Sequence, residues 1–183
     1  MKTVRVGSLV LEPQVAAHAA EMFAVLSDPA IYEFENSPPE SRALLERRFA
    51  LLESRVSPSG DEQWFNWVIR LQSGELAGYV QATIAPDGTA QIAYELGSRF
   101  WRQGIGSTAV RAMLAELAES YGVRTVSATV KVRNYRSVAF LRSLDFGADP
   151  PHGGPAARHD PDEVVMYKSL GAANNALPTQ RSR

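Results

Sequence analysis

Two glycines, Gly104 and Gly106, stand one residue apart just before a strongly helical segment, with Arg102 and Ser107 beside them. The first N–H groups of a helix have no partner inside the helix, and the helix dipole makes this end attractive to phosphate. Glycine lets an anion come close to the backbone because it has no Cβ. The stretch therefore has the parts of a pyrophosphate site, although the same two glycines also suit a tight turn without a ligand.

Two familiar phosphate-binding motifs do not fit this stretch. A P-loop needs a lysine directly after its last glycine, whereas Ser107 and Thr108 follow Gly106. A Rossmann motif usually has a third glycine at the position where this chain has Ala109, and it needs a βαβ unit near the start of the chain. Neither nucleotide-binding motif is therefore expected.

The elements that must position this stretch follow from the spacing of the apolar residues, which repeat every two residues in strands and every three or four in helices. The expected elements are a strand at 4–11, helices at 15–29 and 37–56, strands at 63–71, 75–84 and 89–96, a helix at 108–122, a strand at 124–130, a helix at 134–144 and a strand at 162–170. A further short strand is considered near Phe146. This β-α-α-β-β-β-α-β-α-β order predicts an α+β fold with about four helices on a central, mixed and mostly antiparallel sheet.

Length and composition predict a single domain. The 183 residues are 45% apolar and 21% charged, which is ordinary for a globular protein. We expect the domain at 1–170 and a disordered polar tail at 171–183. The formal net charge of −1 gives no broad basic surface for nucleic acid.

Several other function classes are not expected. The chain has no cysteine, which excludes disulfides and thiolate chemistry, and its three histidines lack metal-ligand spacing, so no metal site is predicted. These histidines are His18, His152 and His159. No apolar run has the roughly 20 residues of a membrane span, and the N-terminus does not have the pattern of a signal peptide. We therefore expect a cytoplasmic protein without a membrane partner.

The stretch from Trp101 to Gly106 resembles the acetyl-CoA loop of the GCN5-related N-acetyltransferases (GNAT), which reads (Gln/Arg)-x-x-Gly-x-(Gly/Ala). Tryptophan at the first position is common in the branch that resembles the ribosomal-protein alanine acetyltransferases. Three further stretches are similar to family segments in the same order, and together they extend the resemblance over about residues 5 to 170. They are Glu35–Ser41, Gln91–Gly97, and Asn134 with Ser137, Phe140 and Asp145-Phe146.

This resemblance implies the GNAT fold and acetyl-CoA as co-substrate, with no metal. In the family, the loop amides hold the pyrophosphate of CoA and the preceding strand pairs with its pantetheine arm. The implied cofactor-binding residues are Leu96, Gly97, Trp101, Arg102, Gln103, Gly104, Ile105, Gly106, Ser107 and Asn134. Asn134 has a second expected role, because asparagine is a good cap for the helix that follows it.

Acetyl transfer to an amine needs a base for the amine and a proton for the departing thiolate. The resemblance places Gln91 where relatives carry a glutamate base. Glutamine cannot be a base but can orient water, and Glu95 lies on the same strand face if no bulge intervenes. Ser137 is the implied proton donor because Leu141 replaces the family tyrosine. Both Glu95 and Ser137 also have ordinary structural interpretations, as a surface carboxylate and as a helix serine bonded to its own backbone.

On the acceptor side, the resemblance places Tyr32, Glu33 and Glu35 on a loop where carboxylates would attract an ammonium group, although surface charge would also explain the glutamates. The expected function is transfer of acetyl to a primary amine, either a protein N-terminus or a small molecule. The resemblance also allows a homodimer. The alternative is a non-catalytic acyl-CoA-binding module, because Gln91 and Leu141 replace proton-transfer groups; a nucleotide-binding regulatory domain is a weaker alternative.

Overall fold

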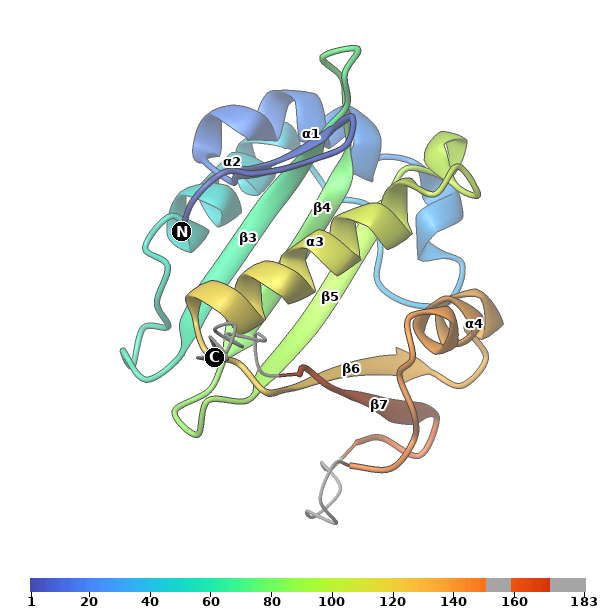
Figure 1. Ribbon diagram of the computed structural model, residues 1–183. Helices are drawn as coiled ribbons and strands as arrows, with labels where there is room; N and C mark the ends of the chain where they lie inside the picture. Colours follow the sequence, from blue (N-terminus) through green and yellow to red (C-terminus); the bar gives the residue numbers. More distant parts are fainter. Residues whose placement is uncertain (151–158, 172–183) are drawn as a thin grey trace, which may run out of the picture.

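The computed structural model describes residues 1–150 and 159–171, so that the expected tail lies outside the described residues apart from Gly171. His152, one of the three histidines considered above, also lies outside them. The order of strands and helices confirms the α+β prediction (Figure 1). The elements are β1 (Val4–Val6), β2 (Leu9–Pro13), η1 (Ala16–His18), α1 (Ala19–Leu26), η2 (Pro29–Tyr32), α2 (Arg42–Leu52), β3 (Gln63–Arg70), β4 (Leu76–Ile84), β5 (Ala90–Leu96), η3 (Ser98–Phe100), α3 (Ile105–Ser120), β6 (Thr125–Lys131), α4 (Tyr135–Ser143) and β7 (Glu163–Ser169).

The strands form one seven-stranded sheet in which each strand lies beside the next strand of the sequence. Neighbouring strands are antiparallel except β5 and β6, which are parallel. This parallel ladder is short, since it joins Ala90 to Val126 and Gln91 to Ser127 and then stops. Beyond these pairs β5 and β6 diverge, so that the sheet opens toward α4 (Figure 1).

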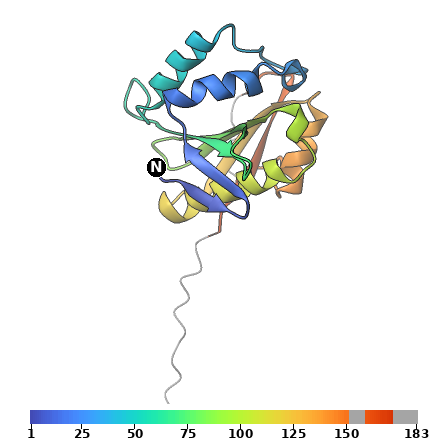
Figure 2. The ribbon, with the colours of Figure 1, turned by 90° about the horizontal axis from the view of Figure 1, so that it is seen from above.

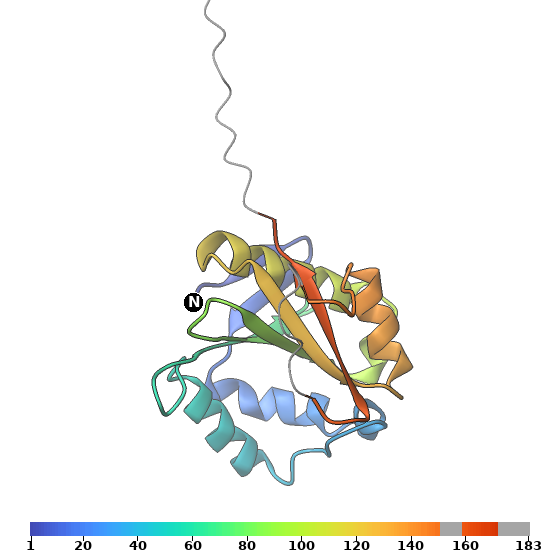
Figure 3. The same cartoon turned by 90° about the horizontal axis from the view of Figure 1, so that it is seen from below.

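The helices cover both faces of the sheet. Helices α1 and α2 lie on one face and α3 and α4 on the other (Figure 2). Side chains of successive strand residues point to opposite faces, so Trp67 of β3 packs in the core beneath α3, with Met113, whereas Val68 packs against α1 and α2. Strands β6 and β7 run side by side next to α4 (Figure 3). Each helical layer therefore has its own apolar core.

The structure corrects the sequence prediction at three places. The expected strand at 4–11 is a hairpin, because Gly7 turns the chain with a φ of 54° and lets Val6 pair with Leu9. Helix α2 begins at Arg42 instead of residue 37, after Ser41, whose side chain accepts the N–H of Leu44 at 3.2 Å. Near Phe146 there is no strand among the described residues, only a bridge between Gly147 and Tyr167.

A bulge in β4 brings two strands into very close contact. Ile69 pairs with Gly78 and Arg70 with Leu76, which leaves Ala77 as the extra residue of the bulge. A Cβ on Gly78 would lie 2.0 Å from the carbonyl oxygen of Glu95. Only glycine fits at this position, and it fixes how closely β4 approaches the end of β5.

Within the described ranges, none of the helices combines the length and the hydrophobicity that crossing a membrane requires.

Candidate active site

The divergence of β5 and β6 opens a cavity of about 640 Å³, which we call the cleft. Its walls come from β5, β6, the start of α3 and the inner side of α4. Of the predicted site residues, the following line it: Glu35, Glu95, Leu96, Trp101, Arg102, Gly104, Gly106, Ser107, Asn134 and Ser137. The fold thus brings together residues that are spread over about a hundred positions of the sequence.

The glycine loop forms one end of the cleft. Gly104 caps α3 in the left-handed region, with φ of 76°, which glycine adopts without strain. The hydroxyl of Ser107 donates to the carbonyl of Gly104 at 2.9 Å. Within the described part of the chain, the N–H groups of residues 104–107 have no acceptor, as is usual at a helix start. These donors give the cleft an end suited to an anion.

A free strand edge forms a second wall of the cleft. Gly97 donates its N–H to the carbonyl of Ala77 in β4 at 3.0 Å. Because backbone groups alternate along a strand, the N–H and carbonyl of Tyr94 and Leu96 point the other way, toward the gap left by β6. The indole N–H of Trp101 donates to the carbonyl of Leu96 at 2.9 Å, so that this carbonyl already has a partner. The Tyr94 backbone therefore remains available to an extended ligand.

Three residues predicted to bind cofactor do not line the cleft: Gly97, Gln103 and Ile105. Gly97 is buried and closes the ladder with β4. The Gln103 amide donates to the carbonyl of Arg99 at 2.7 Å, and Ile105 packs against the core. The side chains of Gln103 and Ile105 thus face away from the cavity, whereas the N–H of Ile105 stays among the free donors at the start of α3. This distinction requires the three-dimensional path of the loop.

Helix α4 presents Ser137 to the cleft. Asn134 caps this helix as expected, accepting the N–H of Ser137 on its side-chain oxygen at 3.0 Å. The described hydrogen bonds include none from the Ser137 hydroxyl to its own helix, in contrast to Ser143, whose hydroxyl donates to the carbonyl of Phe140. The Ser137 hydroxyl is therefore not held by its own helix.

Tyr94 also faces the cleft, and the sequence analysis did not give its side chain a role. Burial raises the pKa of Tyr94 to about 12, and Ser137 opposes this rise, which places the two hydroxyls close together. The Tyr94 oxygen is buried, and apart from Ser137 it has no hydrogen-bond partner among the described residues. Its ring packs against Phe140 with centroids 4.8 Å apart. Tyr94 thus keeps its proton at neutral pH and stands beside Ser137.

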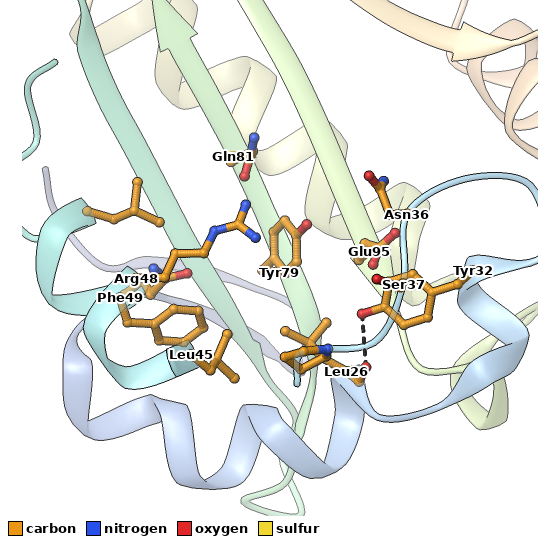
Figure 4. A pocket seen from close by; sticks show the side chains of 13 residues that line it. Leu26, Tyr32, Asn36, Ser37, Leu45, Arg48, Phe49, Tyr79, Gln81 and Glu95 are labelled. Atoms are coloured by element: carbon orange, nitrogen blue, oxygen red, sulfur yellow. Dashed lines mark hydrogen bonds between the residues drawn. The ribbon is translucent and has the colours of Figure 1, made fainter. Parts of the chain in front are cut away.

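A second cavity of about 260 Å³, the small cavity, lies on the other face of the sheet (Figure 4). Helices α1 and α2 and the loop before α2 enclose it over β4 and β5. Tyr32 lines it and donates its hydroxyl to the carbonyl of Leu26 at 2.9 Å. Burial raises the pKa of Tyr32 to about 12, with a contribution from Glu95, so that this group stays neutral.

Glu95 stands where the two cavities meet, since it lines both of them. Its strand, β5, pairs with β4 without a bulge, and Tyr79 lies opposite Glu95. Burial raises the pKa of Glu95 from 4.5 to about 7; the charge of Glu35 adds to this rise and that of Arg48 opposes it. A carboxylate with a pKa near neutrality accepts and releases protons readily at physiological pH.

The remaining predicted residues lie differently. Glu33 lines neither cavity and forms an ion pair with Arg136, whose guanidinium also stacks over Trp101 at 5.0 Å. Gln91 also lies outside both cavities, is exposed at the start of β5, and donates to the hydroxyl of Thr129 at 3.2 Å. The interpretation of Glu33 as surface charge fits this geometry, and Gln91 is too far along the strand to act with Glu95.

In residues 1–150 and 159–171 no three acidic or histidine side chains gather as a metal site would require.

Comparison with known proteins gives consistent matches. The family model "Acetyltransferase (GNAT) domain" matches residues 8–147. An uncharacterized N-acetyltransferase, p20 of Bacillus licheniformis, is 24% identical over 148 residues, which are 80% of this chain and 83% of that protein.

Solved structures show the same fold. RimL, a ribosomal L7/L12 alpha-N-protein acetyltransferase in complex with coenzyme A, superposes with a TM-score of 0.75 at 21% identity, covering 93% of this chain and 99% of that one. The ribosomal-protein-S5-alanine acetyltransferase of Vibrio fischeri superposes with a TM-score of 0.70 at 15% identity, covering 91% and 96%. At these identities the structures show the shared fold and no more.

Proposed function

The chain belongs to the GNAT acetyltransferases, and on this premise we propose that it transfers the acetyl group of acetyl-CoA to the primary amine of a protein N-terminus or a small molecule. The observation that carries the proposal is the position of Glu95 at the junction of the cleft and the small cavity. A group that faces both cavities can act on an amine held in one of them while the acetyl donor lies in the other.

The described residues fit acetyl-CoA in the cleft. The N–H groups of residues 104–107 would bind the pyrophosphate, and the free backbone edge at Tyr94 would pair with the amides of the extended arm. Gly106 lies beside Phe140 in the wall of the cleft, where a Cβ would make an ordinary van der Waals contact with the ring at 3.6 Å. A neighbouring fold, RimL, was solved with coenzyme A bound, which supports this assignment.

Acetyl-CoA, when bound, supplies the acetyl group as a thioester whose departing thiolate needs a proton. Glu95 takes the proton of the acceptor ammonium on its carboxylate oxygen, directly or through a water molecule. Glu35 increases the negative charge at this end of the small cavity and thereby attracts the ammonium. These two carboxylates act before transfer, since the amine becomes a nucleophile only when it is neutral.

The proton for the thiolate comes from the hydroxyl of Ser137, which in turn takes up the proton that the acceptor nitrogen loses when the amide forms. This hydroxyl faces the cleft and is not used by its own helix. Tyr94 stands behind it, and its phenol is protonated at neutral pH and can hydrogen bond to Ser137 as the proton leaves. The base and the acid therefore lie on different elements, β5 and α4, on the two sides of the cleft.

A thiol-release assay with acetyl-CoA and a panel of amines and N-terminal peptides tests this function. We expect thiol release that depends on the acceptor, together with a higher melting temperature in the presence of CoA, because a ligand that binds only the folded state stabilises it. Absence of release with every amine up to about pH 9, with CoA still raising the melting temperature, would favour the acyl-CoA-binding module. If CoA has no effect on melting, the assignment of the cleft is wrong.

A further inference from the structure

The small cavity contains polar groups that acetyl transfer itself does not use. The guanidinium of Arg48, on α2, projects over the cavity near Tyr79 (Figure 4). Within the described part of the chain, Arg48 makes no hydrogen bond and no ion pair, whereas Arg70, Arg99 and Arg136 are all paired. The charge of Arg48 lowers the pKa of Glu95 without forming an ion pair with it, and an arginine in a cavity wall whose guanidinium is not paired is suited to receive an anion from outside.

Gln14 gives an independent observation at the same cavity. Its side chain is only 2% exposed and lines the cavity wall at the end of β2. Its Nε2 is buried without an acceptor among the described residues, although the backbone N–H of Gln14 bonds to the carbonyl of Asn66 at 2.9 Å. Buried polar groups are nearly always hydrogen-bonded in native proteins. This unused donor therefore indicates a ligand oxygen.

The rest of the cavity wall explains how Arg48 is held there. Leu45 and Phe49 on the same side of α2 are buried in the core between the helices and the sheet. Residues three and four apart share one face of a helix, and an adjacent position lies at its edge. Arg48 therefore stands at the rim of the buried face, where it is exposed and also lines the cavity.

The two ends of the small cavity carry opposite charge. Glu95, with Glu35 close enough to raise its pKa, marks the acidic end. Gln14 follows β2, and β3 and β4 lie between β2 and β5, so the backbones of Gln14 and Glu95 are three strand spacings, or about 14 Å, apart across the sheet. Along the strands, Gln14 is level with Ala93, two residues before Glu95. A ligand that spans part of this distance has its positive and negative groups several bonds apart.

We propose that the small cavity selects an acceptor that carries a carboxylate, with the amine at Glu95 and the carboxylate bound by Arg48 and Gln14. The proposal rests on the proposed function, because it names the acceptor class of the same site. The carboxylate has two sources of the same chemistry: the terminal carboxylate of a short free peptide or amino acid, or an acidic side chain close to a protein N-terminus.

Pairs of acceptors that differ only in this carboxylate test the proposal. The first pair is the free dipeptide Ala-Ala and its C-terminal amide; the second is the tripeptide amides Ala-Asp-Ala and Ala-Asn-Ala. Acetylation is measured by thiol release, and binding of the same peptides to the full chain is measured by calorimetry in the presence of CoA, which has no acetyl group to transfer. We expect the acid of at least one pair to be preferred about tenfold in kcat/KM and in affinity, and the preferred pair identifies the source.

Two variants and a control assign the preference to the cavity. Arg48→Gln should reduce the preference to nearly one, and the acid and amide are compared within the variant because loss of this charge also raises the pKa of Glu95 and affects both rates. Gln14→Leu should lower it several-fold, with the melting temperature showing whether this buried substitution folds. Arg47→Gln is the matched control, because Arg47 is exposed on the same helix and lines neither cavity; it should keep the full preference.

The outcomes separate the two proposals. Equal turnover and equal binding of acid and amide in both pairs would overturn the carboxylate proposal while leaving acetyl transfer intact. Preferential binding of the acid that depends on Arg48, without any acetylation, would support the acceptor class and overturn the transferase function. A preference that survives Arg48→Gln would also refute the proposed binding of the carboxylate.

Discussion

Replacing Glu95 by glutamine should make the protein more stable and far less active. The substitution keeps the size of the side chain and removes its titration. Burial raises the pKa of this carboxyl from 4.5 to about 7, and each pH unit corresponds to about 1.4 kcal/mol. Above pH 7 the ionised group therefore lowers the free energy of unfolding by roughly 3 kcal/mol relative to a neutral side chain.

The size of this stabilising effect depends on pH. Below pH 4.5 the carboxyl is protonated in both the folded and the unfolded chain, so that Glu95→Gln should change stability little. Between pH 4.5 and 7 the folded state holds a proton that the unfolded state has lost, and wild-type stability falls as the pH rises. The advantage of Glu95→Gln should therefore grow over this interval and reach a plateau above it.

Urea unfolding of both proteins at several pH values measures the difference directly. At neutral pH the expected difference in the free energy of unfolding corresponds to an increase in melting temperature of roughly 6 to 12 °C for a chain of this size. In the same preparation turnover should fall by roughly 10² to 10⁴, because the base is lost, while the melting shift caused by CoA remains.

Glu46→Gln is the matched control. Glu46 is exposed on α2, lines neither cavity and makes no hydrogen bond among the described residues, so its removal should leave stability and turnover unchanged. A stability difference for Glu95→Gln that does not vary between pH 4.5 and 7 would refute the raised pKa. Unchanged turnover would refute the role of Glu95 as the base.

Four further substitutions have distinct expected results. Ser137→Ala should lower kcat by roughly 10² without weakening CoA binding measured by calorimetry; weaker binding with unchanged kcat would assign Ser137 to cofactor binding instead. Gly104→Ala should cost about 1 kcal/mol in urea unfolding, because the new side chain meets open space but must adopt a φ of 76°, and it should weaken CoA binding; a gain in stability would contradict this. Gly78→Ala should destabilise the fold by about 4 kcal/mol or prevent folding, since its Cβ would lie 2.0 Å from the Glu95 carbonyl, and a near-native melting temperature would rule out the close contact. Glu35→Gln should shift the acidic limb of the pH dependence of kcat/KM to lower pH, because Glu35 raises the pKa of Glu95; a shift to higher pH would be inconsistent with this contact.

The sequence predicted the fold well where local patterns and turn residues agree. Helix α3 was expected from residue 108 and begins three residues earlier, at Ile105, directly after Gly104. The difference is small because the residues that mark a helix start are close to it in the sequence. The hairpin of β1 and β2 was missed because apolar residues continue on both sides of Gly7 and resemble one strand. Its turn is marked only by a positive φ, which the sequence does not state.

The site was less predictable, because its chemistry depends on residues brought together by packing. Glu95 was expected from its place on a strand, but its raised pKa comes from burial and from Glu35, sixty positions earlier. Arg48 and Gln14 belong to no sequence motif. Only the folded structure shows that α2 and the end of β2 bring them to the wall of the small cavity. For Glu33 the sequence left both acceptor binding and surface charge open, and its ion pair with Arg136 of α4 favours surface charge.

The short parallel ladder between β5 and β6 has a consequence for the order in which ligands bind. In the described strands only two residue pairs join the antiparallel part of the sheet to the part that contains β6 and β7. A cofactor lying along β5 would act as the missing length of strand and couple the two parts. Because Glu95 lies on that strand, the acceptor cavity would reach its final shape only afterwards, so that acetyl-CoA binds first and the amine second, and each increases the affinity for the other.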